Sequence, residues 1–141
     1  MFEHITIVVA AQPESVQTIR NLLGTGPKII EVFKLYEAKK IINESVDLII
    51  CGLHFNDSRM FDLLRITKAN PLVQAIPFLC FKNSNSELGA TAIEAFKIAC
   101  NALGAAGFVD YHALKLRHGA EEADNQFRKI IETIIENTLL L

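Results

Sequence analysis

The hydrophobic positions of this chain follow two alternating patterns along its length. Short, almost unbroken apolar runs indicate strands that are buried on both faces, and between them apolar residues recur at the spacing of one helical face. The runs predict strands at residues 5–10, 28–33, 47–51, 77–81 and 108–109. The clearest helical stripe lies near the end of the chain and consists of Phe127, Ile130, Ile131, Ile134, Ile135 and Leu139.

Turn residues help to place the remaining helices. Pro13 suits a first helical turn because its missing N–H costs nothing there, and Gly24 follows the last apolar residue of that helix. Pro71 ends a later helix because the residue before a proline is pushed out of the helical region. Besides the helix that begins at Pro13, we expect helices at residues 35–43, along a stretch that has Phe61, Leu64 and Thr67 on its inward face and ends at Asn70, and from Ser86 or Ala90 to Leu103.

Strands and helices thus alternate without a break over residues 1–141, which predicts a single α/β domain. A strand that follows a helical connection returns parallel to the strand before it. The expected architecture is therefore a flavodoxin-like, doubly wound sheet of five parallel strands with helices on both faces. The common strand order for this count is 2-1-3-4-5, and ligands of such sheets bind beyond the carboxyl ends of the strands, where the order reverses.

Composition narrows the classes of function. Half of the 141 residues are apolar, enough for a substantial core, and 14 basic against 16 acidic residues give a net charge of −2. Because the chain has no run of lysines or arginines, nucleic-acid binding is disfavoured. The first apolar run spans about six residues, too short for a bilayer, and has no basic leader. We therefore expect a cytoplasmic protein that does not bind membranes.

Cysteines and histidines offer little further chemistry. The three cysteines are widely spaced, which argues against a disulfide framework or a zinc site and favours small core residues. If Gly52 and Lys82 end neighbouring strands in one register, Cys51 and Cys80 point to opposite faces of the sheet. No histidine pair has metal-ligand spacing, and the glycine motifs of hydrolases and dinucleotide-binding proteins are missing. We expect no metal, no cofactor and no enzyme.

The segment from Val46 to Arg65 reads as a buried strand, a short loop and an amphipathic helix. It resembles the third strand and third helix of response-regulator receiver domains, where Asp-Leu, three hydrophobic residues and an aspartate precede a loop and a Leu-Leu-Arg helix. In this register Gly52 occupies the place of the phosphate-accepting aspartate. The matching motifs are Asp47-Leu48, Leu63-Leu64-Arg65, Ile76-Pro77 and Gly104-Ala105.

The resemblance implies a chemistry that this chain does not carry. Receiver domains hold magnesium with two acidic residues after strand one, and they use an aspartate, a hydroxyl and a lysine after strands three, four and five. Phosphoryl transfer to a carboxylate gathers negative charges that a divalent cation and a fixed ammonium must offset. The residues at these positions here are Val9-Ala10 or Ala10-Ala11, then Gly52, Lys82 and Tyr111, the last preceded by Asp110.

Three side chains near the strand ends have two interpretations each. Asp57 could act as a displaced nucleophile, but a mobile loop would position it poorly, so we expect it to cap the third helix. Lys82 could bind an anion beside Asn83 or pair with Asp110 in place of the lost metal, and the pair is favoured. His54 could contact a ligand, although an exposed loop side chain is the simpler expectation.

These observations predict a non-phosphorylatable pseudo-receiver that acts through protein–protein interaction in signal transduction. Its partner, or a second copy in a homodimer, would contact the face formed by the helix ending at Leu103, the strand at 108–109 and the last helix, near the apolar tail at residues 139–141. It could also be the receiver-like part of a longer signalling ancestor, kept as a dimerisation unit.

The alternative from another class is a small-molecule or anion-binding domain that uses the strand-end crevice. An open pocket with converging polar groups would favour it, whereas a filled surface would favour the interaction module. Its contacts would be His54, Asp57, Lys82, Asn83, Asp110 and Tyr111.

Overall fold

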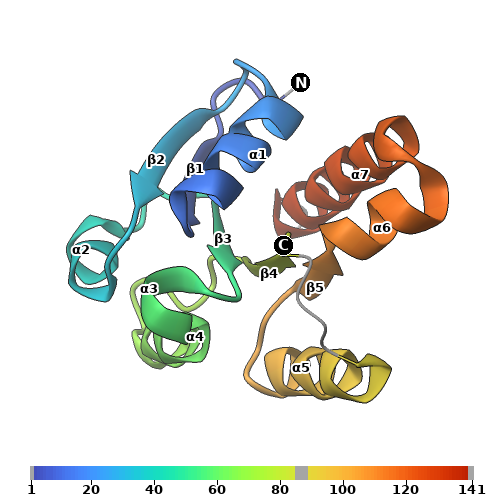
Figure 1. The fold of residues 1–141 in the computed structure, drawn as a ribbon. Coiled ribbons are helices and arrows are strands. Elements are labelled where there is room, and N and C mark those ends of the chain that lie inside the picture. The colour runs from blue at the N-terminus through green and yellow to red at the C-terminus, as the bar shows by residue number, and fades with distance from the viewer. Residues whose placement is uncertain (1, 85–88, 140–141) are drawn as a thin grey trace.

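A parallel sheet forms the centre of the computed structural model, which describes residues 2–84 and 89–139. Its strands lie in the order β2-β1-β3-β4-β5 (Figure 1). The predicted fold class and strand order are therefore confirmed. The strands are β1 (Thr6–Ala10), β2 (Lys28–Val32), β3 (Leu48–Gly52), β4 (Phe78–Lys82) and β5 (Gly107–Asp110).

Helices cover both faces of the sheet. One core cluster joins the sheet to α2, α4 and α5, and the other joins it to α1, α6 and α7. The fourth predicted helix begins at Ala90, and the alternative start at Ser86 lies outside the described residues. The helices are α1 (Pro13–Leu23), α2 (Leu35–Ile41), α3 (Phe55–Ser58), α4 (Met60–Ala69), α5 (Ala90–Ala102), α6 (Tyr111–His118) and α7 (Ala120–Leu139).

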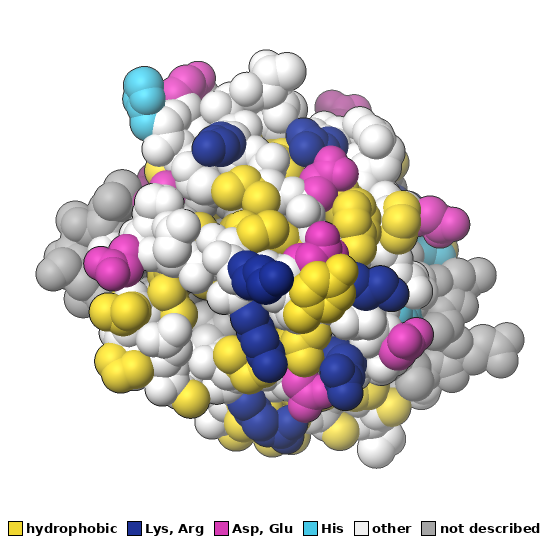
Figure 2. All heavy atoms as spheres, turned by 90° about the vertical axis from the view of Figure 1, so that its left-hand side faces the viewer, with side chains coloured by type: hydrophobic (Ala, Val, Ile, Leu, Met, Phe, Trp, Pro, Cys, Tyr) yellow, Lys and Arg dark blue, Asp and Glu magenta, His cyan; other side chains and the backbone are white. Residues whose placement is uncertain are grey.

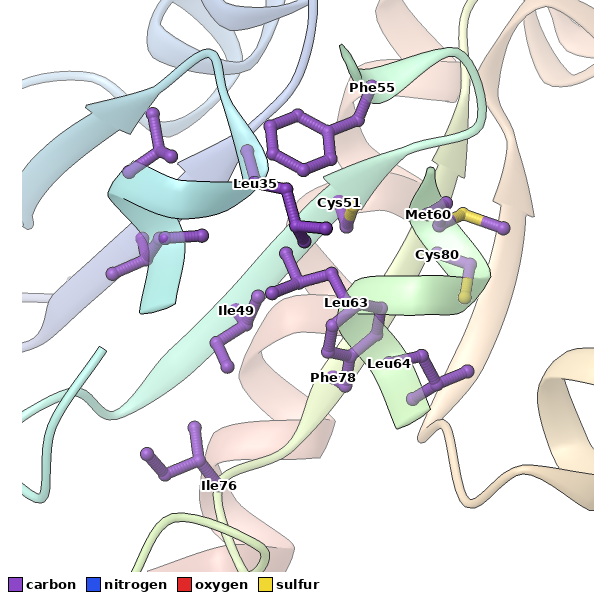
Figure 3. Packing of buried hydrophobic residues seen from close by; sticks show 14 of the residues in the cluster. Leu35, Ile49, Cys51, Phe55, Met60, Leu63, Leu64, Ile76, Phe78 and Cys80 are labelled. Atoms are coloured by element: carbon purple, nitrogen blue, oxygen red, sulfur yellow. The ribbon is translucent and has the colours of Figure 1, made fainter. Parts of the chain in front are cut away.

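The central strands are buried on both faces, as their unbroken apolar sequences predict. Every residue of β3 and β4 is buried, and alternate residues contribute to opposite core clusters. Figure 3 shows the cluster in which Leu63 and Leu64 of α4 pack towards Ile49 and Phe78 of the sheet. Full burial of one such side chain stabilises the fold by about 1.5–3 kcal/mol.

The cysteine geometry corrects one expectation. Cys51 of β3 and Cys80 of β4 are register partners, so they point to the same face of the sheet (Figure 3). Both share a core cluster with Cys100 of α5. The prediction of opposite faces was wrong because Gly52 pairs with Phe81, which leaves Lys82 one residue further along. All three thiols are free and buried, as expected of core residues, and burial raises the pKa of Cys51.

Helix α6 was not predicted from the sequence. It has no apolar stripe, because charged and apolar residues mix along its eight positions. Its ends do carry signals: Asp110 accepts a hydrogen bond from Ala113 N at 3.0 Å as an N-cap, and Gly119 adopts a φ of 84° just past its end. Across the part of the chain that the structure describes, no helix is long and apolar enough to cross a lipid bilayer.

Candidate functional site at the strand ends

The carboxyl ends of β1 and β3 meet in close contact. Val9, Ala10 and Ala11, which stand where the resemblance places the acidic pair, are at most 1% exposed. A Cβ atom added at Gly52 would lie 3.1 Å from the Cβ of Ala11, closer than about nine in ten such contacts in proteins. The place of a phosphate-accepting side chain is thus occupied by the first residue after β1. Any side chain at Gly52 requires Ala11 to move.

A buried ion pair joins the ends of β4 and β5. The register places Lys82 beside Asp110, and Lys82 Nζ lies 3.5 Å from Asp110 Oδ1 with the two side chains 3% and 14% exposed. Lys82 Nζ also donates a hydrogen bond to the Ser84 carbonyl oxygen at 2.7 Å. The expected ion pair between Lys82 and Asp110 is therefore present, while its role in place of a bound cation stays a prediction.

The crevice that remains above the strand ends is small. It has a volume of about 60 Å³, whereas pockets for metabolite-sized ligands commonly hold about 300–1,000 Å³. Among the described residues, no group of three or more His, Cys, Asp or Glu side chains could hold a metal ion. The crevice is lined by Gln12, Glu14, Ser15, Gly52, Leu53, His54, Phe81, Lys82, Asn83 and Ser84.

Two polar side chains from the loops close this crevice. His54 is half-buried rather than exposed, and its Nε2 lies 3.4 Å from Ser84 Oγ. Asn83 donates a hydrogen bond to Thr18 Oγ1 of α1 at 3.2 Å, while its own side-chain oxygen is buried without a partner among the described residues. These contacts tie the loops after β3 and β4 over the strand ends. Sequence reasoning did not predict these contacts, because none follows from a periodic pattern.

Asp57 lies apart from the crevice and does not cap the next helix. Asn56, Asp57 and Ser58 have φ values of 44°, 58° and 65°, a left-handed turn that Asn and Asp tolerate better than most residues. This turn delays α4, whose N-cap is Arg59 without a side-chain capping bond. The capping prediction for Asp57 was therefore wrong. Asn56 instead accepts a hydrogen bond from Leu35 N at 2.7 Å, which ties the turn to α2.

Tyr111 turns away from the crevice and into the core. Its ring stacks on Phe81 at 6.0 Å between centroids and meets Phe127 edge-on at 6.3 Å. Its hydroxyl donates a hydrogen bond to Asp124 of α7, and Lys115 Nζ lies 4.9 Å above the ring. Burial, followed by the bond to Asp124, raises the pKa of Tyr111 to about 12. Tyr111, at the position that corresponds to the receiver lysine, thus joins the start of α6 to α7.

The structure therefore brings together only part of the predicted set. Of the six residues expected around the crevice, His54, Lys82 and Asn83 line it. Asp110 reaches it only through Lys82, while Asp57 is exposed on its loop and Tyr111 is buried. Sequence reasoning also missed the contact of Ala11 with Gly52, for which the only signal is a pair of small residues, one just after β1 and the other at the end of β3.

Solved structures of receiver domains share this fold over nearly the whole chain. The non-phosphorylated HemR receiver domain from Leptospira biflexa matches with a TM-score of 0.67 and 19% identity, over 93% of this chain and 94% of its own. The signal receiver domain of a histidine kinase from Syntrophus aciditrophicus matches with a TM-score of 0.68 and 16% identity, over 94% of this chain and 90% of its own. A response regulator from Hahella chejuensis matches with a TM-score of 0.63 and 16% identity, over 89% of this chain and 94% of its own. No protein-family model and no curated protein sequence matches the chain. The resemblance to receiver domains is confirmed at the level of the fold.

Proposed function

We propose that this chain is one receiver-like domain, residues 1–141, that is not phosphorylated and works through protein–protein contact in signal transduction. The observation that carries the proposal is the filled strand-end site, in which Ala11 packs against Gly52 and Lys82 pairs with Asp110. On this proposal the protein is cytoplasmic, needs no cofactor and is not an enzyme.

The electrostatics of the site support this proposal. Aspartyl phosphorylation needs a carboxylate nucleophile and a divalent cation that offsets the charge of the incoming phosphoryl group. Val9, Ala10, Ala11 and Gly52 offer no oxygen ligand from their side chains. The cation nearest these strand ends, Lys82 Nζ, already faces Asp110 and the Ser84 carbonyl. At the positions where a receiver domain carries its reactive groups, an incoming phosphoryl group would therefore find neither a carboxylate acceptor nor an unpaired lysine.

The proposed contact surface lies on the side of the sheet edge formed by α5, β5 and α7. Figure 1 shows β5 at the end of the sheet, with α5 on one side and α6 and α7 on the other. Either a partner protein or a second copy of the chain could occupy this side. The alternative function, a small-molecule or anion site in the crevice, has less support because the crevice holds only about 60 Å³.

Treatment with acetyl phosphate and magnesium, followed by intact mass measurement, tests the loss of phosphorylation. We expect an unchanged mass under conditions in which a receiver domain with a complete acidic site gains one phosphoryl group. An adduct on the wild-type chain would contradict the proposal. If that adduct disappeared in an Asp57→Asn variant, the displaced loop carboxylate would be the acceptor.

A further inference from the structure

Two large hollows lined by described residues lie along β5, away from the crevice. A cleft of about 460 Å³ separates α5 from α6, which, like the short α3, is additional to the predicted alternation of five strands and five helices. The apolar side chains that line it come from α5, β5, α6 and α7, and most are half-buried. They are Ala90, Ile93, Phe108, Val109, Ala113, Leu114 and Ile130.

This cleft continues into a second hollow along α7. The second hollow has a volume of about 480 Å³ and shares Phe108, Val109 and Ile130 with the first. All four residues of β5, which is an edge strand, line one or both. We call the two together the β5 groove. Its continuous apolar floor resembles a binding surface more than the interior of a metabolite pocket.

Exposed hydrophobic side chains extend the groove on both sides. Ile98 of α5 is 63% exposed and Leu116 of α6 is 77% exposed. Ile98 lies four residues after Glu94, and Leu116 lies three residues after Ala113, so each is one helical turn from a residue that lines the groove. Large apolar side chains with this exposure, next to a half-buried apolar floor, indicate that a partner covers the surface.

The charges at the rim select the kind of partner. Lys97 of α5, Arg117 of α6 and Lys129 of α7 line the groove and are exposed. No hydrogen bond or ion pair joins any of these three side chains to another described residue. Glu94 is the acidic side chain at this rim that is not already paired, because Asp110 faces Lys82. The rim is thus positive although the whole chain carries a net charge of −2.

The shape of the groove favours a helical partner. β5 spans four residues, about 13 Å, and can offer only a few main-chain hydrogen bonds to an added strand. Most of the apolar lining comes instead from side chains of α5, α6 and α7. A groove of helix-borne apolar side chains is the usual receptor for an amphipathic helix, whose apolar residues enter it at i, i+3 or i+4, and i+7.

We propose that the β5 groove binds an amphipathic helix of a partner protein whose apolar stripe is flanked by acidic residues. This assignment rests on the proposed function and specifies the partner. A second copy of this chain fits the groove less well, because two such faces would bring Lys97, Arg117 and Lys129 of one copy towards the same cations of the other.

Two matched synthetic helices test this assignment. They share one Leu stripe and differ only in the polar face, which carries Glu in one peptide and Lys in the other. We expect fluorescence anisotropy to show that the Glu peptide binds the wild-type chain about tenfold more tightly than the Lys peptide, and less tightly at higher salt. Amide NMR shifts should cluster at residues 93–117 and 129–134.

Charge reversal on the rim supplies the decisive comparison. The variant Lys97→Glu, Arg117→Glu and Lys129→Glu should lose about tenfold in affinity for the Glu peptide and gain affinity for the Lys peptide. The matched control reverses Lys34, Lys39 and Lys40, which are exposed at the start of α2 and along it. It changes the net charge by the same amount. Helix α2 lies on the left-hand side of Figure 1, the side that faces the viewer in Figure 2, where basic, acidic and hydrophobic side chains are interspersed. This control should bind like the wild type.

Each other result overturns the assignment. Those results are binding of neither peptide, equal binding of both, equal losses in the two variants, or self-association of the chain through this groove. Failure here is distinguishable from failure of the proposed function, because the phosphodonor experiment does not involve the groove. An unphosphorylated chain that ignores both peptides refutes only the choice of partner, whereas a phosphorylated chain refutes the proposed function whatever it binds.

Discussion

Replacement of Lys82 by Met probes the ion pair that occupies the strand-end site. The substitution keeps an unbranched apolar stem but removes the ammonium group that lies 3.5 Å from Asp110 and donates to the Ser84 carbonyl at 2.7 Å. It leaves the Asp110 carboxylate, 14% of whose side chain is exposed in the wild type, without its ion-pair partner. The variant should therefore be less stable than the wild type.

The size of the loss follows from the burial of the pair. Removing one partner of a fully buried pair costs about 3–5 kcal/mol because the other charge stays uncompensated. Here Asp110 is partly reached by water and keeps its hydrogen bond from Ala113 N at 3.0 Å, which reduces the expected cost to about 2 kcal/mol. For 141 residues the entropy of unfolding is roughly 0.3 kcal/mol/K, so the melting temperature should fall by about 7 °C.

A double-mutant cycle with Asp110→Asn separates the pair from general effects on packing. Asparagine retains the N-cap of α6, so the double variant leaves no buried charge and should be more stable than the sum of the single losses predicts. Arg20→Met is the matched control, because its partner Glu31 and Arg20 itself are 34% and 41% exposed and the pair contributes little. Thermal and urea unfolding followed by circular dichroism measure all four variants. An unchanged melting temperature in Lys82→Met, or additive losses in the cycle, would refute the reasoning.

Two further changes test the contacts on either side of this pair. Gly52→Ala places a Cβ 3.1 Å from that of Ala11 and should lower the free energy of unfolding by about 1–2 kcal/mol. Adding Ala11→Gly to the same chain should restore part of this loss. Equal stability of Gly52→Ala and the wild type would show that the strand end is not filled. Tyr111 keeps its proton in the folded chain up to a pKa of about 12, against 10 for an ordinary tyrosine, so its contribution to stability is complete below pH 10 and is lost between pH 10 and 12. Tyr111→Phe should remove this part of the loss of stability at alkaline pH, as measured by urea unfolding. If the free energy of unfolding fell with pH at the same slope in the variant and the wild type, the assignment would be contradicted.

The sheet was predictable because burial of both faces leaves a strong one-dimensional signal. The unbroken apolar runs gave the strands and the helical stripes gave most of the helices, including α7. What periodicity cannot supply is the register between neighbouring strands, and a shift of one residue moves a side chain to the opposite face. This is why Cys51 and Cys80 were expected apart although they are register partners in the same core.

The errors at the candidate site have local causes. Three consecutive left-handed residues, Asn56 to Ser58, carry no sequence mark beyond the tolerance of Asn and Asp for that conformation. They moved the start of α4 to Met60 and removed the capping role expected of Asp57. Helix α6 was not predicted because few of its side chains pack into the core: Tyr111 is the one buried residue among its eight. The residues that indicate this helix in the sequence are its caps, Asp110 and Gly119, and not a periodic spacing of apolar residues.

The filled site and the proposed groove share one side chain. Asp110 Oδ1 lies 3.5 Å from Lys82 Nζ and also accepts the hydrogen bond from Ala113 N that caps α6. The same carboxylate therefore neutralises the cation at the strand ends and fixes the start of the helix that forms one wall of the β5 groove. A bound metal at the strand ends would compete with Lys82 for this carboxylate, because both are cations seeking the same oxygen. On the proposed function, Lys82 takes the place of such a metal and holds Asp110 in position, which suits a groove whose shape would not depend on phosphorylation.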